Sequence, residues 1–195
     1  MTPSVTGLRE QRHGWVAVEL DGRPWRVLPA DAVVRAGLRV GRPLDRSTAR
    51  ELGREVRRSA ALTAATRSLA ASDRSRVALD RRLAQAGHSA AAREEAIAAL
   101  GRAGVLDDVR LAQSRAERLA RRGYGDAAIR ADLQRRQIPD EAVVEAVAAL
   151  RSERDRASRI LEGKAVTPQL LRRLAGRGFS RETLEDVGSP FAHEA

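Results

Sequence analysis

The chain has 195 residues, a formal net charge of +10 and no cysteine. The absence of cysteine excludes disulfide scaffolds and cysteine-ligated metal sites, which fits a reducing compartment. No stretch approaches the roughly 20 consecutive apolar residues of a membrane-spanning helix, and the first residues lack the apolar run of a signal peptide. We therefore expect a cytoplasmic protein of one or two domains.

The positive charge is almost entirely arginine, because Lys164 is the only lysine. A sequence pI near 11.4 favours a polyanionic partner, either nucleic acid or an acidic protein surface. Residues 46–106 carry 12 arginines against 6 acids, whereas residues 107–150 carry 8 of each. The excess of positive charge therefore lies in the segment 46–106.

The N-terminal part of the chain predicts a small β-containing segment. Residues 1–13 are polar, and we expect them to be flexible. Within residues 14–44, two runs of alternating apolar residues flank Asp21-Gly22, the strongest short-range signal of a β-hairpin, and a short helix follows. Pro24 lacks an N–H donor and is expected at a strand start or a sheet edge.

The only two tryptophans, Trp15 and Trp25, belong to this predicted hairpin. We expect them to anchor it against neighbouring helices, since a small sheet cannot bury much surface alone. Stacking on nucleobases is the alternative interpretation.

Beyond residue 45, one helical element occurs three times. LDRRLAQAGHS (79–89) returns as IRADLQRRQIP (129–139) and as LLRRLAGRGFS (170–180). In each copy, two apolar residues four positions apart mark one face of a helix. A residue four positions later marks the helix end, and Ser or Pro opens the next helix. This residue is glycine in the outer copies but Gln137 in the middle one, which puts a left-handed helix end there in doubt.

Each copy extends to three helices, because further apolar residues lie fourteen positions before and after its central leucine, which is Leu83, Leu133 or Leu174. They are Leu69, Leu119 and Ile160 before it, and Ile97 and Val147 after it. The third copy has Gly188 at the last of these positions, so its final helix is expected to be short. Repeats that each bury one face against a neighbour predict a mainly α fold, an elongated array of three tandem three-helix repeats behind the hairpin segment.

The predicted boundaries follow from these signals. Repeat 1 with its lead-in helix spans 45–106, repeat 2 spans 107–150, repeat 3 spans 151–188, and a tail occupies 189–195. Helix caps are expected from side-chain oxygens that accept backbone N–H groups. The candidates are Asp45 or Ser47, Asp107, Asp126, and Thr167 before Pro168.

The adjacent carboxylates Asp107 and Asp108 have two interpretations. At a helix start they suit capping and the helix dipole, and capping is the favoured interpretation. A divalent-metal or acid–base site is the alternative, but no histidine or third carboxylate lies at helical spacing nearby.

No motif for catalysis or for a cofactor is present. Gly163-Lys164-Ala165 lacks the upstream glycine and the hydroxyl of a phosphate-binding loop. The three histidines, His13, His88 and His193, lie far apart in sequence and define neither a zinc site nor a catalytic triad. We therefore interpret the chain as a binding protein without cofactor or metal, not as an enzyme.

The order of these motifs resembles the RecX family, the regulators of the RecA recombinase, over roughly residues 12–187. Three short elements are the most specific. They are Leu106-Asp107-Asp108, the Arg-Gly-Tyr-Gly of residues 122–125, and Arg177-Gly178-Phe179.

The resemblance implies three tandem three-helix repeats and a regulatory activity. The protein would bind RecA and its nucleoprotein filament along the groove, bridge neighbouring subunits and contact the bound DNA. It would suppress ATP hydrolysis by RecA, filament growth and strand exchange, and it is expected to be monomeric. The candidate contacts to RecA or DNA are Arg118, Arg121, Arg122, Arg172, Arg173 and Arg177, with solvated helix faces paired to Glu117 or Asp186 as the alternative.

Two other functions remain open from the sequence. Two helices across a Gly-Ser turn also describe a helix-turn-helix DNA-binding protein, whose binding would fall steeply with salt and would not need RecA. A helical scaffold for another acidic partner is the third interpretation.

Overall fold

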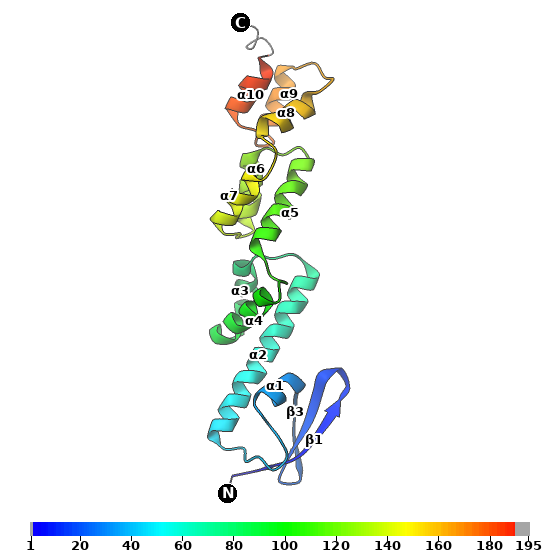
Figure 1. Ribbon diagram of the computed structural model, residues 1–195, viewed down its shortest axis with the longest axis vertical. Helices are drawn as coiled ribbons and strands as arrows, with labels where there is room; N and C mark the ends of the chain where they lie inside the picture. The colour runs from blue at the N-terminus through cyan, green and yellow to red at the C-terminus, as the bar shows by residue number, and fades with distance from the viewer. Residues whose placement is uncertain (1, 190–195) are drawn as a thin grey trace. The chain divides into compact units, whose positions relative to one another are not determined.

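The computed structural model describes residues 2–189, which divide into two compact units. The first unit holds the residues up to 72 together with 79–105. The second holds 73–78 and the residues from 106 onward. Figure 1 labels the helices and strands of both units.

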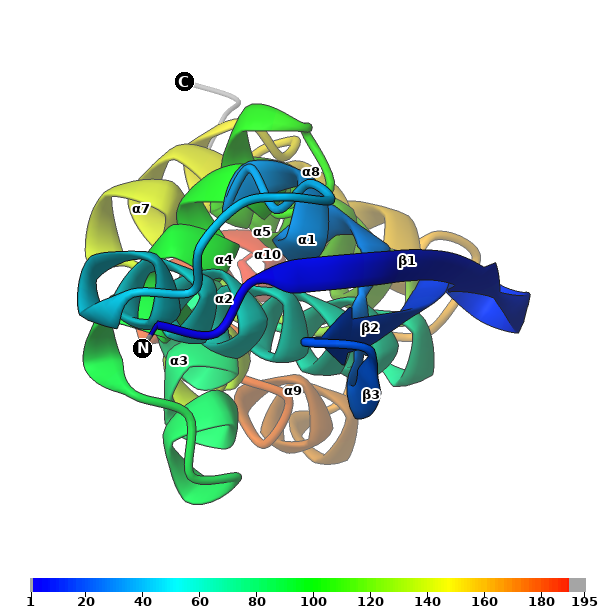
Figure 2. The same ribbon diagram turned by 90° about the horizontal axis from the view of Figure 1, so that it is seen from below.

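The first unit opens with a three-stranded antiparallel sheet in the order β1-β2-β3. Its strands are β1 (Val5–Gln11), β2 (Trp15–Leu20) and β3 (Arg23–Pro29), and the 3-10 turn η1 (Arg12–Gly14) joins the first two. The strands lie side by side in Figure 2. Asp21 and Gly22, with φ of 49° and 78°, form the tight turn that the sequence predicted. Pro24 lies at the start of the edge strand β3, also as predicted.

The prediction of a flexible segment 1–13 was wrong, because residues 5–11 form strand β1. Val5 is fully buried, and its N–H donates to the Arg42 carbonyl at 3.0 Å. An ion pair between Arg9 and Glu19 links β1 to β2, and the Glu19 carboxylate lies where a side chain on Gly7 would be. This strand is held mainly by backbone hydrogen bonds and polar contacts. Its sequence therefore lacks most of the alternating apolar residues by which strands are recognised.

The helices of the first unit are α1 (Ala30–Arg35), α2 (Arg46–Ala71), α4 (Ala90–Arg102) and most of α3 (Arg76–Gln85), whose first residues, 76–78, belong to the second unit. The α2 helix is continuous, and the Asp45 carboxylate caps it by accepting the Thr48 N–H at 2.8 Å. One core joins the sheet to α1 and α2 through Val16, Val18, Leu28, Val33 and Leu52. A second joins α2 to α4 through alanines, which allow these two helices to approach closely.

The second unit contains two groups of three helices. The first group is α5 (Asp108–Arg121), α6 (Asp126–Arg135) and α7 (Asp140–Ala148), and the second is α8 (Glu153–Leu161), α9 (Pro168–Ala175) and α10 (Arg181–Gly188). Each group has its own buried apolar cluster. The last helix has only 8 residues and ends at Gly188, as predicted from the missing apolar residue.

The three sequence copies share one backbone geometry. Their central leucines, Leu83, Leu133 and Leu174, are at most 1 % exposed. The carbonyl of each leucine accepts the N–H five residues on, from His88, Ile138 or Phe179, at 3.1–3.3 Å. The residue before each donor has positive φ, and Gln137 adopts this conformation with φ of 58° despite its side chain. The mainly α fold of three-helix repeats is therefore confirmed, with a three-stranded sheet where a hairpin was predicted.

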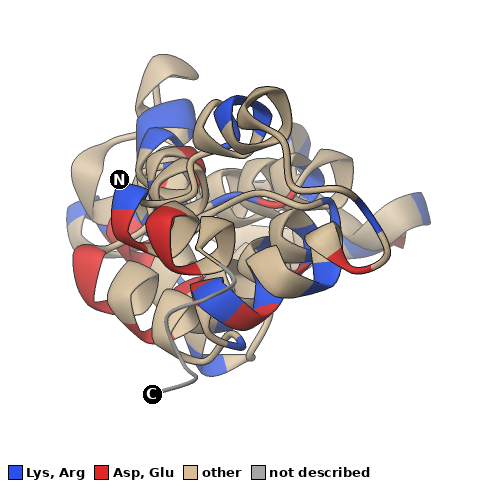
Figure 3. Cartoon of the chain, turned by 90° about the horizontal axis from the view of Figure 1, so that it is seen from above, with Lys and Arg blue, Asp and Glu red and all other residues tan. Residues whose placement is uncertain are grey.

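Among residues 2–189, no helix has the combination of length and apolar character that a bilayer crossing requires. Basic and acidic positions are interspersed along the helices visible in Figure 3.

Candidate protein-binding groove

The two glycine motifs singled out from the sequence meet in the second unit. The Gly125 N–H donates to the Arg177 carbonyl at 2.9 Å, and the Ala127 N–H donates to the Gly178 carbonyl at 3.1 Å. A Cβ on Gly125 would lie 2.3 Å from backbone atoms of Gly178 and Phe179. Position 125 therefore needs glycine because two loops from different repeats touch there through their backbones.

Two of the candidate arginines flank the only tyrosine at this junction. The guanidinium carbons of Arg122 and Arg177 both lie 5.9 Å from the centre of the half-buried Tyr124 ring, within cation–π range. The Arg177 guanidinium also donates to the Arg122 carbonyl at 3.4 Å. Arg177 therefore helps to hold the two repeats together, which limits its availability to a partner.

The other four candidates are exposed and lie on two helices, two on α5 and two on α9. Arg121 at the end of α5 pairs with Glu117 at 3.3 Å, as the alternative interpretation expected. Arg118 lies on the same helix, while Arg172 and Arg173 lie on α9. Asp186 pairs with Arg154 at 3.9 Å and not with any candidate.

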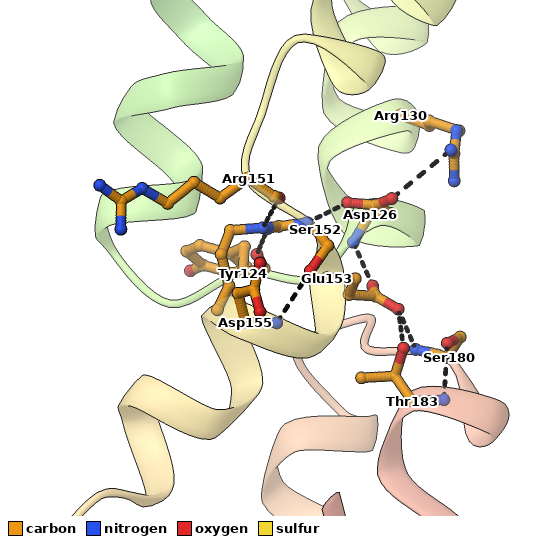
Figure 4. Close-up of polar contacts among 10 residues, drawn as sticks. Tyr124, Asp126, Arg130, Arg151, Ser152, Glu153, Asp155, Ser180 and Thr183 are labelled. Carbon is orange, nitrogen blue, oxygen red and sulfur yellow. Dashed lines mark hydrogen bonds and ion pairs between the residues drawn. The ribbon is translucent and has the colours of Figure 1, made fainter. Parts of the chain in front are cut away.

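A buried arginine that the sequence analysis did not identify organises the junction. Arg156 of α8 is 8 % exposed and donates to the carbonyls of Arg151 and Tyr124 at 3.1 and 2.9 Å. It also forms an ion pair with Asp126, which in turn faces Arg130 at 3.6 Å. Figure 4 shows these contacts. Arg156 thereby fixes the start of α8 against the start of α6.

Glu153 caps two helices at once. Its carboxylate accepts the Asp126 N–H at the start of α6 at 2.6 Å, and the Ser180 N–H and the Thr183 hydroxyl at the start of α10 at 3.0 Å each (Figure 4). Burial opposes ionisation of Glu153, but the hydrogen bonds from these groups outweigh it and hold its pKa below the usual value. The prediction that Asp126 caps α6 was wrong, because its side chain turns to Arg156 and the cap residue is Gly125.

Beside this network lies a groove of about 510 Å³ between the end of α5, the end of α7 and α8. Ala120, Leu150 and Ile160 contribute apolar, half-buried side chains to its wall. Exposed arginines at the end of α5, in the loop between α7 and α8 and on α8 also line it: Arg121, Arg151 and Arg159. Glu117 lines it too, as the ion-pair partner of Arg121. Arg151 and Arg159 form no ion pair with any carboxylate among residues 2–189, and Figure 4 shows the Arg151 side chain pointing away from the buried network.

Apolar wall and cationic rim together suit an acidic protein segment that inserts an apolar side chain. Of the six sequence candidates, only Arg121 lines this groove. Arg151 and Arg159 were missed because they look like ordinary solvated helix residues in the sequence. The Leu150-Arg151 and Arg159-Ile160 pairs come together with the end of α5 only when repeats 2 and 3 fold together.

Asp107 and Asp108 both serve backbone capping. The Asp107 carboxylate accepts the Arg110 N–H at 3.0 Å, and the Asp108 carboxylate accepts the Arg76 N–H at 2.9 Å. The capping interpretation is confirmed for Asp107, which is the cap residue of α5. Thr167 likewise caps α9, as predicted.

The tryptophans do not anchor the sheet. Trp15 is 46 % exposed and Trp25 is 36 % exposed, and neither belongs to the buried cluster under the sheet. The Arg26 guanidinium carbon lies 5.4 Å from the Trp25 ring centre. The core-facing positions of these strands hold Val16, Val18 and Leu28 instead. Of the histidines, His13 lies in the exposed turn η1 and His193 lies outside the described residues.

Comparisons with known proteins agree on one family. Residues 107–147, which form α5 to α7, match the family model described as RecX, second three-helix domain. The crystal structure of regulatory protein RecX superposes with a TM-score of 0.75 at 17 % identity and covers 96 % of this chain and 90 % of that chain. The crystal structure of RecX from Lactobacillus salivarius gives a TM-score of 0.60 at 17 % identity, over 67 % of this chain and 94 % of that one. A search of curated proteins found no match.

Proposed function

Since residues 107–147 match the second three-helix domain of RecX and the fold matches that of regulatory protein RecX, we propose that this chain binds the RecA recombinase and its nucleoprotein filament and inhibits them. The inhibited steps are ATP hydrolysis by RecA, filament growth and strand exchange. The observation that carries the proposal is the match of residues 107–147 to the second three-helix domain of RecX. The matching fold over 96 % of the chain supports it.

The groove at the junction of repeats 2 and 3 is the proposed RecA contact. It joins an apolar wall to Arg151 and Arg159, which form no ion pair among residues 2–189, and this is a composition expected of a protein interface. Multiple contacts along a polymer of identical subunits add through effective concentration, so that individually weak contacts suffice.

The test measures ATP turnover by RecA on single-stranded DNA as the purified chain is added. We expect turnover to fall at stoichiometric ratios with the wild-type chain. Arg151→Gln combined with Arg159→Gln should weaken this inhibition, because it removes the free cations at the groove. The matched control is Arg81→Gln combined with Arg82→Gln, two exposed arginines of α3 with the same change in net charge.

No change in turnover with the wild-type chain would contradict the proposal. Inhibition that is equally weak in both double variants would leave RecA as the partner but reject the groove as the contact. Far-UV circular dichroism of each variant establishes that it is folded.

A helix-turn-helix DNA-binding protein remains the alternative function. In the α3–turn–α4 unit the second helix would read bases with its N-terminal residues. Those residues are Ala90, Ala91 and Arg93, and Arg93 is engaged by Asp80 at 2.8 Å and by the His88 carbonyl at 3.0 Å. This composition does not favour base recognition by α4.

A further inference from the structure

The N-terminal half of α2 carries a row of four arginines on one side. Arg46, Arg50, Arg54 and Arg57 are all exposed, and their spacing of four, four and three residues places them within about 80° of one another around the helix at about 100° per residue. We call these four residues the arginine ridge. The 26-residue length of α2 gives the ridge a rigid support.

The ridge lies on the side of α2 that faces away from the core. Thr48, Leu52 and Ser59 are buried, and they lie roughly 180° around the helix from the centre of the ridge. Ser59 donates to the Asp31 carboxylate of α1 at 2.8 Å, and Leu52 belongs to the cluster beneath the sheet. The arginines are therefore not required for packing in this unit, and they project from a surface that no other part of it covers.

None of the four ridge arginines forms an ion pair with a carboxylate within the described chain. The two acids of this half of the helix are already engaged elsewhere, Glu51 with Arg42 at 3.8 Å and Glu55 with Arg58 at 3.3 Å. Between the arginines lie Ala49 and Gly53, which line a shallow depression together with them, with Ser47 and with Glu51, the partner of Arg42. The Arg57 guanidinium lies over Gly53, 3.4 Å from where a Cβ would be.

The ridge differs in chemistry from the groove of the second unit. The depression along the ridge is lined by no large apolar side chain, so a protein partner would find cations there but nothing to anchor an apolar residue. Four arginines rising about 1.5 Å per residue span roughly 17 Å along the helix axis, enough to follow several phosphates of one strand. Guanidinium forks also match the geometry of phosphate oxygens.

We propose that the arginine ridge of α2 binds the phosphate backbone of nucleic acid. The contact is made by the side of a helix and not by a helix inserted in a groove, so it reads no base edges and is independent of sequence. It is separate from the groove proposed to contact RecA. The chain thereby holds a polyphosphate on one unit through charge alone and a protein on the other through charge and apolar contact.

The test measures binding of a fluorescein-labelled oligo-dT strand by anisotropy, without RecA, over a series of salt concentrations. Each phosphate neutralised on a single strand contributes about 0.7 to the slope of log affinity against log salt, so four ridge contacts contribute about 2.8. Between about 50 and about 200 mM salt this amounts to a loss of about 50-fold in affinity. The variant with all four ridge arginines changed to glutamine should lack this part of the slope.

The matched control removes four other exposed arginines of the same unit, with Arg12→Gln, Arg23→Gln, Arg26→Gln and Arg39→Gln. Its net charge equals that of the ridge variant, but the ridge is intact. We expect it to keep most of the wild-type slope. Equal losses in the two variants would show that binding follows net charge, and the ridge would not be a site.

Binding to RecA in the absence of DNA separates this proposal from the proposed function. We expect the ridge variant to bind immobilised RecA as the wild-type chain does. A ridge variant that binds oligo-dT normally but loses RecA would overturn the assignment and make the ridge a protein contact. The wild-type chain could also fail to bind RecA while only the ridge variant loses salt-dependent DNA binding. That result would reject the proposed function but support the ridge as a nucleic-acid site.

Discussion

Replacing Gly125 by alanine tests how repeats 2 and 3 are joined. Gly125 has an ordinary φ of −82°, so backbone strain is not at issue. An added Cβ would lie 2.3 Å from the carbonyl and the next amide of Gly178, which are backbone atoms that cannot rotate away. The loops must separate, and the hydrogen bonds from Gly125 to Arg177 and from Ala127 to Gly178 would lengthen or break.

The expected cost of Gly125→Ala combines two effects. Forcing a methyl group into a filled space costs about 1–3 kcal/mol, and each lost hydrogen bond costs about 1 kcal/mol. We therefore expect about 3–5 kcal/mol of destabilisation, or a fall in Tm of roughly 6–20 °C for a chain of this size. Thermal unfolding followed by far-UV circular dichroism measures it.

Gly176→Ala is the matched control. Gly176 ends α9 with a φ of −64°, and a Cβ there would lie 3.6 Å from the Arg172 and Arg173 carbonyls, an ordinary contact. This variant should unfold within about 1 kcal/mol of the wild type, and the loss of backbone freedom favours the stabilising direction. If Gly125→Ala were as stable as Gly176→Ala, the two loops would not touch as described.

Three further predictions follow from single residues. The pKa of Glu153 is depressed in the folded chain. The ionised carboxylate therefore contributes its full stabilisation above the ordinary pKa of 4.5, and this stabilisation is lost as the pH falls below 4.5. In a plot of Tm against pH, Glu153→Gln should make the fall of Tm at acid pH less steep. Gln137→Gly should stabilise the chain by about 0.5–1 kcal/mol in urea unfolding, because glycine adopts the positive φ of 58° without strain, and a destabilised variant would contradict this. Trp15 and Trp25 are exposed, so acrylamide should quench the fluorescence of the folded chain nearly as well as that of the urea-unfolded chain, whereas strong protection would place them in a core.

The periodic part of the fold was predictable from the sequence because each repeat is built from local signals. Leu83, Leu133 and Leu174 recur at fixed distances from helix-ending residues, and the structure buries all three. The same reasoning identified the caps formed by Asp45 and Thr167, since capping depends on neighbours within a few residues.

Contacts between distant segments were beyond this reasoning. Glu153 caps α6 through Asp126 and α10 through Ser180, each of which lies 27 residues away in the sequence. Local reasoning could not find this contact and therefore assigned the cap of α6 to Asp126, which was wrong. Arg156 is buried although it stands in a run of charged residues. Two of its acceptors, the Asp126 carboxylate and the Tyr124 carbonyl, lie 30 and 32 residues away in the sequence. Strand β1 was missed for the same reason, because its partners define it more than its own sequence does.

The candidate site was predicted in part. The two glycine motifs were identified from their sequence, and the structure brings them into contact through Gly125 and Gly178. The groove beside them depends on side chains from α5, α7 and α8, of which only Arg121 was named in advance. No spacing rule links the Leu150-Arg151 pair to the Arg159-Ile160 pair or to Arg121 until these helices pack.

Sedimentation with preassembled filaments tests the central claim most directly. RecA is assembled on long single-stranded DNA with a non-hydrolysable ATP analogue, mixed with the chain and centrifuged. We predict that the chain enters the pellet saturably with RecA filaments, and to a much smaller extent with DNA alone at moderate salt. A chain that stays in the supernatant with filaments, or that pellets equally with bare DNA, would contradict a RecA-directed function.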